Sequence, residues 1–169
     1  MYFVLAPVKQ FTDDTAMTKS ILKTLIDKRS IDQTYLATNF VKEYYKEPNR
    51  GYGGAVVDVF KKLRTSQFND VLAPAKAQFE GTGSFGNGGA MRVAPVALFN
   101  YNNVDKVIEM ARQSAELTHT HRDGINGTIL QALAIHQSLN LNSSDLLIPD
   151  EFINSLLTRI EPLERENDE

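Results

Sequence analysis

Two adjacent carboxylates flanked by hydroxyl side chains stand near the start of the chain, in the run Thr12-Asp13-Asp14-Thr15. Oxygen atoms of this kind are the ligands that Mg²⁺ prefers, and several lie here within one helical turn. Acidic residues and a threonine also suit the N-terminus of a helix, where they cap free N–H groups and complement the helix dipole. From the spacing alone we favour the capping interpretation over the metal site.

A glycine-rich stretch, residues 81–92 with the sequence GTGSFGNGGAMR, is the second candidate site. Glycine permits positive φ and lets another group approach the backbone closely. The free N–H groups of such a loop, placed before a helix, can hold a phosphate. The loop is neither a Walker A motif, because the lysine is missing, nor a dinucleotide fingerprint, because no strand precedes it. A purely structural turn is an equal alternative.

Aromatic and imidazole side chains lie near these motifs. Phe79 and Phe85 flank the glycine-rich stretch and could stack on an adenine ring, although packing in a core is the more frequent role of phenylalanine. His119 and His121 stand at i and i+2 in a turn, and with His136 they would bind zinc only if all three converged. We favour a histidine that hydrogen-bonds a ligand hydroxyl or phosphate.

Apolar residues recur mostly at helical spacing, which predicts the elements that must position these residues. Residues 65–80 look irregular or short-helical because Pro74 interrupts them. No alternating strand pattern occurs, so the expected fold is an all-α orthogonal helical bundle. The expected helices cover about residues 14–28, 32–47, 55–64, 89–99, 103–117, 124–140 and 150–160.

The composition describes one ordinary domain. The chain has 169 residues, of which 42% are hydrophobic and 23% charged, and this is typical of a globular protein. A net charge of -3 gives no broad basic surface, so direct DNA binding is not expected. The absence of cysteine excludes a disulfide framework and a thiolate nucleophile. With no transmembrane-length window and no secretory signal, we expect an intracellular, soluble protein without a membrane partner.

Four motifs together, in their order along the chain, resemble the ADP-ribosylglycohydrolase family. They are residues 12–17 (TDDTAM), 51–53 (GYG), 83–92 (GSFGNGGAMR) and 117–119 (LTH). Residues 60–63 (FKKL), 74–79 (PAKAQF) and 127–134 (GTILQALA) are similar to the members that release ADP-ribose from serine. The resemblance covers about residues 11–140, and the combination is far more specific than any single motif.

The resemblance implies an all-α fold of the ADP-ribosylglycohydrolase type with a two-Mg²⁺ centre that hydrolyses the bond at the distal ribose of ADP-ribose. Thr12, Asp13 and Asp14 match metal ligands, and the two aspartates match catalytic residues that act through the metal. The residues that match the substrate-binding set are Phe79, Gly83, Ser84, Phe85, Gly86, Asn87, Gly88 and His119. In that set Phe79 and Phe85 correspond to an aromatic pair around adenine.

The resemblance also implies substrates, partners and a location. The substrates are serine-linked ADP-ribose, poly(ADP-ribose) and O-acetyl-ADP-ribose, so the expected partners are ADP-ribose, ADP-ribosylated proteins and poly(ADP-ribose). A monomer is expected, acting in the DNA damage response. The implied compartments are the nucleus and cytoplasm, with the mitochondrial matrix as a further one.

The sequence departs from the family pattern at both ends. Family members carry a downstream Asp-x-Asp-Thr cluster, whereas this chain contains no Asp-x-Asp, and their upstream glutamate would fall before Met1. We therefore expect a divergent segment at residues 1–10, a partial family domain at 11–160 and a charged tail at 161–169. Residues 1–169 alone should show weak or no turnover. The alternatives are a non-catalytic ADP-ribose-binding protein and a ligand-free helical remnant.

Overall fold

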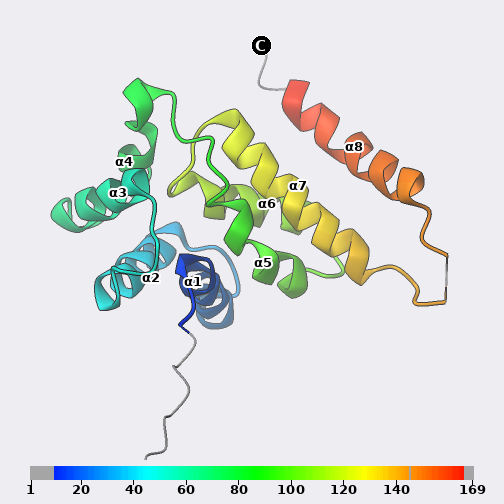
Figure 1. Ribbon diagram of the computed structural model, residues 1–169, viewed down its shortest axis with the longest axis horizontal. Helices are drawn as coiled ribbons and strands as arrows, with labels where there is room; N and C mark the ends of the chain where they lie inside the picture. The colour runs from blue at the N-terminus through cyan, green and yellow to red at the C-terminus, as the bar shows by residue number, and fades with distance from the viewer. Residues whose placement is uncertain (1–9, 145, 166–169) are drawn as a thin grey trace, which may run out of the picture.

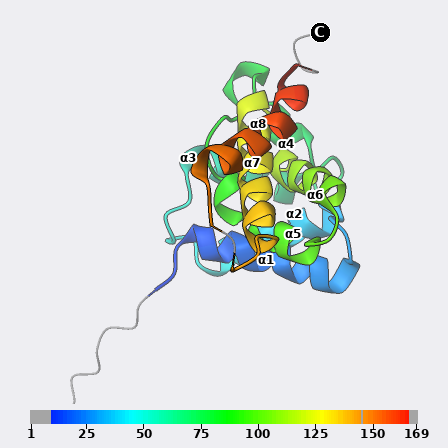
Figure 2. The same ribbon diagram turned by 90° about the vertical axis from the view of Figure 1, so that its right-hand side faces the viewer.

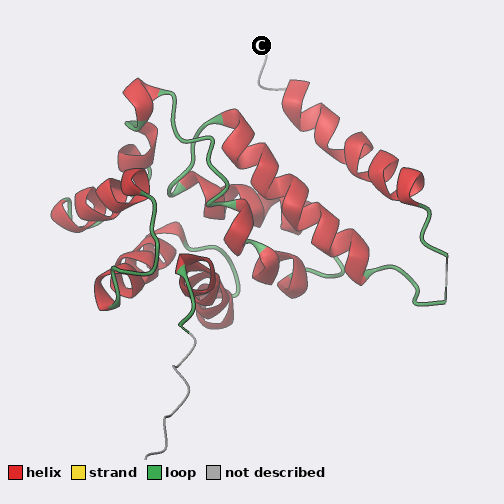
Figure 3. Cartoon of the chain, viewed as in Figure 1, coloured by secondary structure: helices red, strands yellow, loops and turns green. Residues whose placement is uncertain are grey.

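The computed structural model describes residues 10–144 and 146–165, and the regular elements within these ranges are helical (Figure 3). The expected all-α fold is therefore confirmed. The elements are α1 (Asp13–Lys28), α2 (Gln33–Lys46), α3 (Gly54–Thr65), α4 (Ala73–Lys76), the 3₁₀ turns η1 (Phe79–Gly81) and η2 (Ala90–Arg92), α5 (Ala94–Phe99), α6 (Val104–Glu116), α7 (Arg122–Leu139) and α8 (Pro149–Arg165).

The helices form two groups that share one core. Helices α1, α2 and α3 lie together on one side, and α7 crosses the middle of the molecule (Figure 1). Helix α7 packs against α5 and α6, while α1 connects the groups by contacting both α2 and α5. Helix α8 runs beside α7 at the far end, which the view turned by 90° also shows (Figure 2). The loop of residues 77–89 links the two groups.

Local sequence signals place the first three helices where periodicity predicts them. Asp32 caps α2, its carboxylate accepting a hydrogen bond from the Tyr35 N–H at 2.9 Å. The helices then bury their apolar faces against one another: Phe40 of α2 and Phe60 of α3 are fully buried with ring centroids 6.3 Å apart. Burial of apolar area of this kind supplies most of the stabilisation of a short amphipathic helix.

The apolar segment expected as one helix over 89–99 is divided in the structure. Residues 90–92 form η2, and α5 begins only at Ala94. Pro95 lies in the first turn of α5, where its missing N–H removes no helical hydrogen bond. Arg92, the last residue of η2, is buried.

Two helix ends differ from the expected positions. Helix α7 begins at Arg122, because the Nδ1 atom of His121 caps it by accepting the Asp123 N–H at 3.1 Å. Helix α8 continues to Arg165 instead of ending near residue 160, since Leu163 packs against the core. Residues 1–9 of the expected N-terminal segment and 166–169 of the expected tail lie outside the described residues. In the described part, no helix is long and apolar enough to cross a bilayer.

Candidate ligand pocket

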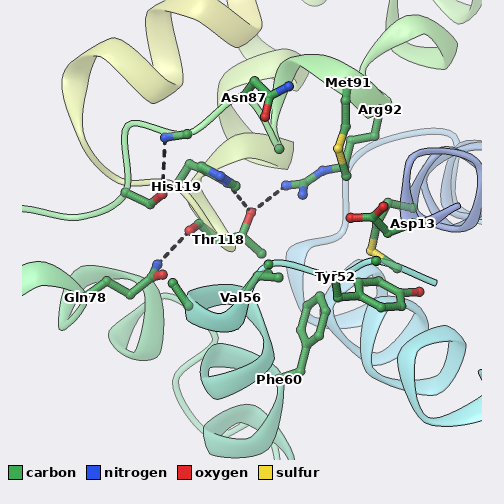
Figure 4. A pocket seen from close by; sticks show the side chains of 17 residues that line it. Asp13, Tyr52, Val56, Phe60, Gln78, Asn87, Met91, Arg92, Thr118 and His119 are labelled. Carbon is green, nitrogen blue, oxygen red and sulfur yellow. Dashed lines mark hydrogen bonds between the residues drawn. The ribbon is translucent and has the colours of Figure 1, made fainter. Parts of the chain in front are cut away.

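A pocket of about 330 Å³ opens where α1, the start of α3, the glycine-rich loop and the segment after α6 meet (Figure 4). Its wall combines backbone of glycines with polar and apolar side chains from segments far apart in the sequence. The lining residues are Asp13, Met17, Gly51, Tyr52, Gly53, Ala55, Val56, Phe60, Gln78, Ser84, Gly86, Asn87, Gly88, Met91, Arg92, Thr118 and His119.

The N-terminus of α1 is fastened to the loop that precedes α3. The Asp13 N–H donates to the Arg50 carbonyl at 2.9 Å, and the Arg50 side chain donates back to the Phe11 carbonyl at 2.6 Å. The Arg50 guanidinium also stacks 3.7 Å from the centre of the Phe11 ring. Gly51 turns the chain with φ of +90° beside the Asp13 carboxylate. These contacts hold that carboxylate at the pocket.

The acidic pair at the start of α1 is divided between the pocket and solvent. Asp13 is partly buried and lines the pocket, whereas Thr12 and Asp14 are exposed. Burial, and then the charge of Asp14, raise the pKa of Asp13. Thr12 is the N-cap residue but makes no side-chain cap; its hydroxyl donates to the Asp14 carboxylate at 2.6 Å. The side chain of Thr12 therefore does not have the capping role that we favoured from the spacing.

The glycine-rich loop is held by a network centred on Gln78. The Gln78 carbonyl accepts the N–H groups of Gly81 and Gly83 at 3.1 and 3.0 Å, and its amide donates to the Thr118 carbonyl at 2.7 Å. Gly83 has φ of +76° and packs so tightly on Thr120 that a side chain there would collide with it. A left-handed conformation of this kind favours glycine. Gly83 is thus buried behind the pocket and does not line it.

The later glycines let backbone approach the His119 ring and the start of α7. A Cβ atom built on Gly88 would lie 2.6 Å from the ring atom Cε1 of His119, and one on Gly86 would lie 3.5 Å from Nε2. On the other side of the loop, a Cβ on Gly124 would lie 2.6 Å from the Ser84 carbonyl oxygen. Close packing therefore explains several of these glycines, whereas phosphate binding by the loop stays a prediction.

His119 is a buried and uncharged member of the pocket wall. Its pKa is lowered to about 3, first by burial and then by the charge of Arg92. The Nδ1 atom lies 2.7 Å from the Thr118 hydroxyl, which fixes the ring plane. His121 has a different role as the cap of α7. Within residues 10–144 and 146–165, no three histidine, aspartate or glutamate side chains are placed to hold a metal ion, so the three histidines do not converge there.

Arg92 is the functional candidate that sequence reasoning missed. Its side chain is completely buried, and its Nη2 atom donates to the Ser114 carbonyl at 2.9 Å and to the Thr118 hydroxyl at 2.7 Å. The guanidinium lies 4.6 Å from the centre of the Phe40 ring, and burial lowers its pKa to about 9. Its position at the end of the glycine-rich stretch is the sequence feature that could have identified it. The residue type alone suggests a charge at the surface.

Sequence reasoning also missed the wall opposite the glycine-rich loop. That wall is formed largely by Met17, Tyr52, Val56 and Phe60. From the sequence, Met17, Val56 and Phe60 fall on the apolar faces of expected helices; together with Tyr52 they also lie in the core or pack against it as well as facing the pocket. Burial raises the pKa of Tyr52 to about 12, so its hydroxyl carries a proton. An apolar wall facing polar groups is common in pockets for small molecules.

The aromatic pair lies at the surface outside the pocket wall. Phe79 and Phe85 are 53% and 69% exposed, with ring centroids 6.5 Å apart and planes inclined by 37°. The Phe85 ring also makes an edge contact with the His121 ring, and their centroids are 5.7 Å apart. Phe79 itself has φ of +49°, a conformation that costs on the order of 1 kcal/mol for a residue with a side chain. Core packing is therefore not the role of either ring.

The fold thus collects most, but not all, of the expected site residues at one pocket. Six of them line it: Asp13, Ser84, Gly86, Asn87, Gly88 and His119. The others lie outside the pocket wall. Thr12, Asp14, Phe79 and Phe85 are on the solvent side, and Gly83 lies behind the loop. The resemblance to ADP-ribosylglycohydrolases predicts an all-helical fold in which Asp13, the glycine-rich loop and His119 belong to one site, and in the structure these residues line one pocket.

Comparison with known proteins agrees with that class. The sequence model of the family described as ADP-ribosylglycohydrolase matches residues 2–168, and the chain belongs to this family. It is similar to the protein named ADP-ribosylhydrolase ARH3 in several vertebrates. The Gallus gallus protein is 49% identical over 157 residues, which cover 93% of this chain and 41% of that protein. The Homo sapiens protein is 49% identical over 154 residues, 91% of this chain and 41% of that protein.

A less similar relative covers a similar share of the chain. The Danio rerio protein of the same name is 44% identical over 159 residues, which cover 94% of this chain and 42% of that protein. The chain therefore spans about two fifths of the length of the curated relatives it matches.

Proposed function

We propose that this chain is the ADP-ribose-binding part of a Mg²⁺-dependent hydrolase that releases ADP-ribose from serine-linked ADP-ribosylated proteins. The observation that carries the proposal is that Asp13, the glycine-rich loop and His119, which are far apart in the sequence, line one pocket. Membership of the family and similarity to proteins named ADP-ribosylhydrolase support the reaction class. Poly(ADP-ribose) and O-acetyl-ADP-ribose are further proposed substrates.

The donor atoms at the start of α1 fit a hard cation in their chemistry. Asp13 and Asp14 are adjacent carboxylates, the pKa of Asp13 is raised partly by the charge of Asp14, and the Thr12 hydroxyl lies on the Asp14 carboxylate. A cation there would relieve the repulsion between the carboxylates. Thr12, Asp13 and Asp14 would hold Mg²⁺, which as a Lewis acid would orient ribose hydroxyls and a water and offset developing charge.

The remaining pocket residues bind and orient the ligand. The Ser84 hydroxyl and the Asn87 side chain offer hydrogen bonds, and the exposed backbone at Gly86 can approach a diphosphate closely. The apolar wall around Val56 and Phe60 excludes water from the opposite side. Phe79 and Phe85 are exposed beside each other, and in this proposal they would stack on the adenine ring. Positioning of this kind supplies a large part of a rate enhancement.

Titration of the 169-residue chain with ADP-ribose in a calorimeter tests the binding part of the proposal. We expect saturable binding that strengthens with Mg²⁺ and falls about tenfold in Ser84→Ala, the loss expected for one hydrogen bond to a charged ligand. Ser66→Ala, on the α3 C-terminus and outside this pocket, is the matched control. Equal affinity of Ser84→Ala and the wild type would contradict the assigned site.

Release of ADP-ribose from a serine-modified peptide, with and without Mg²⁺, tests turnover. In the part of the chain that the structure describes, Asp13 and Asp14 are joined by no third carboxylate or histidine that could hold the metal. Two carboxylates leave most of an octahedral shell to water. We therefore propose, as a second candidate for residues 1–169 alone, that they bind ADP-ribose with little turnover; rapid Mg²⁺-dependent release would exclude this candidate.

A further inference from the structure

We propose that Arg92 and Thr118 are positioning residues that place the ring proton of His119 on Nε2, so that the ring donates a hydrogen bond into the pocket. The order of donors is Arg92 to Thr118, Thr118 to His119, and His119 to an oxygen of the ligand. The identity of that ligand as ADP-ribose rests on the proposed function, whereas the position of the proton does not.

The hydroxyl group of Thr118 lies between three neighbours. Arg92 Nη2 is 2.7 Å away, His119 Nδ1 is 2.7 Å away and the Ala115 carbonyl oxygen is 3.4 Å away. Arginine can only donate, so the Thr118 oxygen accepts from Arg92 with one lone pair. The single hydroxyl proton must then point either to His119 or to Ala115. Figure 4 shows the two short contacts that converge on this oxygen.

The Ala115 carbonyl is already occupied by better donors. It accepts the backbone N–H of Thr118 at 3.0 Å and the backbone N–H of His119 at 2.8 Å. A carbonyl oxygen has two lone pairs, and both are used by bonds shorter than the 3.4 Å contact with the hydroxyl. The Thr118 proton is therefore directed to His119 Nδ1, which as an acceptor carries no proton of its own.

An uncharged imidazole that accepts at Nδ1 carries its proton on Nε2. Nε2 faces the glycine-rich loop: Cβ atoms built on Gly86 and Gly88 would lie 3.5 and 3.0 Å from it. Both glycines line the same pocket as His119. Because neither carries a side chain, the space in front of the Nε2–H is left to a ligand atom. That atom must be an acceptor, such as a phosphate or hydroxyl oxygen.

The buried charge of Arg92 polarises the chain of hydrogen bonds that runs from Arg92 through Thr118 to His119. A guanidinium that donates to the Thr118 oxygen polarises the hydroxyl, and a polarised chain of hydrogen bonds strengthens each later donor. Arg92 thereby favours an electron-rich oxygen at Nε2 while itself staying bonded to Ser114 and Thr118. The same charge opposes protonation of the ring, so the ring donates from Nε2 and still does not become a cation.

Nitrogen-15 NMR of the histidine rings in the 169-residue chain tests the position of the proton. The pattern of ¹H–¹⁵N couplings distinguishes the two uncharged tautomers, and His121 and His136 serve as references in the same spectrum. We expect His119 to be protonated on Nε2 alone. In Thr118→Val the Nδ1 resonance should move to higher frequency as its hydrogen bond is lost, whereas Thr118→Ser should keep the wild-type pattern. A wild-type ring protonated on Nδ1 would overturn the inference.

Calorimetry with ADP-ribose tests whether the hydrogen bonds from Arg92 through Thr118 to His119 strengthen binding of the ligand. Thr118→Val should lower the affinity about tenfold, as expected for a weakened hydrogen bond to a charged group, and Thr118→Ser should restore it. Thr158→Val on α8, which also removes a hydroxyl bonded within its own helix, is the matched control. Unchanged affinity in Thr118→Val would overturn the role in binding. If the wild type binds no ADP-ribose, the proposed function and its ligand fail together, while the spectra still decide the position of the proton.

Discussion

The loop of residues 77–89, which contains the glycines of the glycine-rich stretch, and helix α8 make opposite contributions to the fold. The loop is irregular but tightly packed, and the helix is mostly exposed. The loop has little regular structure, yet Gly83 and Ser84 within it are buried against the segment after α6. Helix α8 has seventeen helical residues, with Pro162 inside its last turns, yet Ile160 is the residue that it buries fully. Regular hydrogen bonding and tight tertiary packing are thus separate properties in this molecule.

The loop is specified by contacts between residues far apart in the chain. Gln78 bonds the Thr118 carbonyl, Gly88 touches the His119 ring and Gly124 lies against the Ser84 carbonyl. Each contact tolerates little displacement, because protein interiors are close-packed and an extra methyl group forces neighbours to move. A loop held in this way can present backbone N–H groups in a fixed arrangement.

Local sequence signals and contacts with α7 both contribute to helix α8. Asp150 and Glu151 complement the dipole in its first turn, and the Gln137 side chain of α7 donates to the Phe152 carbonyl at 3.0 Å. Two of its large apolar side chains, Ile153 and Leu157, are 51% and 44% exposed. Substitutions should therefore have large effects in the loop and small effects on most of α8, and the following predictions test that difference.

Gly83→Ala should lower the free energy of unfolding by about 3 kcal/mol. The new methyl group would collide with Thr120, and φ of +76° is strained for any residue with a side chain. Gly127→Ala is the control, because Gly127 lies within α7 with nothing within 4 Å of its Cβ position. It should raise the free energy by about 0.5–1 kcal/mol through helix propensity. Denaturant unfolding measures both, and equal effects would remove the distinction between the regions.

Acidification should destabilise the fold through His119. Its pKa is about 3 when folded, against an ordinary value of 6.5. Between these values the unfolded chain binds a proton at this residue and the folded chain does not. The free energy of unfolding therefore falls as the pH falls below 6.5, by up to about 1.4 kcal/mol per pH unit. Above pH 6.5 this contribution to stability is fully present.

The difference between the wild type and His119→Gln isolates this effect. Glutamine does not titrate, so its curve keeps every other acid-linked contribution, including that of Asp13, whose raised pKa has the opposite sign. Subtracting the two curves, measured by urea unfolding from pH 7 to pH 4.5, should leave the slope of His119 alone. Parallel curves would show that the ring takes up a proton in the folded protein, contrary to its burial.

The helices could be predicted from the sequence better than the loop of residues 77–89. Periodicity and caps predicted α1, α2, α3 and α6 within a few residues, because their signals lie within one helix. Helix α7 starts at Arg122, slightly before the expected position near 124, because histidine at position 121 is an unusual cap. The family resemblance named the loop and His119, but no local pattern reveals that Gly88 touches that ring.

Arg92 shows most clearly why residue type alone cannot predict which side chains are buried at the site. An arginine is expected at the surface from its type, and only the fold brings Ser114 and Thr118 to its guanidinium. The opposite error concerns Phe79 and Phe85, for which residue type alone favours the core although both rings are exposed. In both cases the departure from the average burial of a residue type occurs beside the pocket, where function can oppose stability.

Ile160→Ala should have the largest effect of any truncation on α8, about 2 kcal/mol. Ile160 is 4% exposed and belongs to the main apolar cluster, so the substitution removes buried methyl groups and leaves a cavity. Thermal and urea unfolding should both report the loss, with ADP-ribose affinity unchanged because α8 does not line the pocket. An effect below 0.5 kcal/mol, on the scale of a surface substitution, would mean that α8 contributes no stability to the bundle.

Leu157→Gln should have the smallest effect, within about 0.5 kcal/mol of the wild type. Leu157 lies one turn before Ile160 on the same helix but is 44% exposed, and glutamine has nearly the helix propensity of leucine. The substitution therefore changes the polarity of α8 with little change in its helical preference, at a position that is not part of the main apolar cluster. Paired with Ile160→Ala in the same unfolding experiment, it separates tertiary packing from helix formation. A loss as large as that of Ile160→Ala would show that the outer side of α8 is covered in solution.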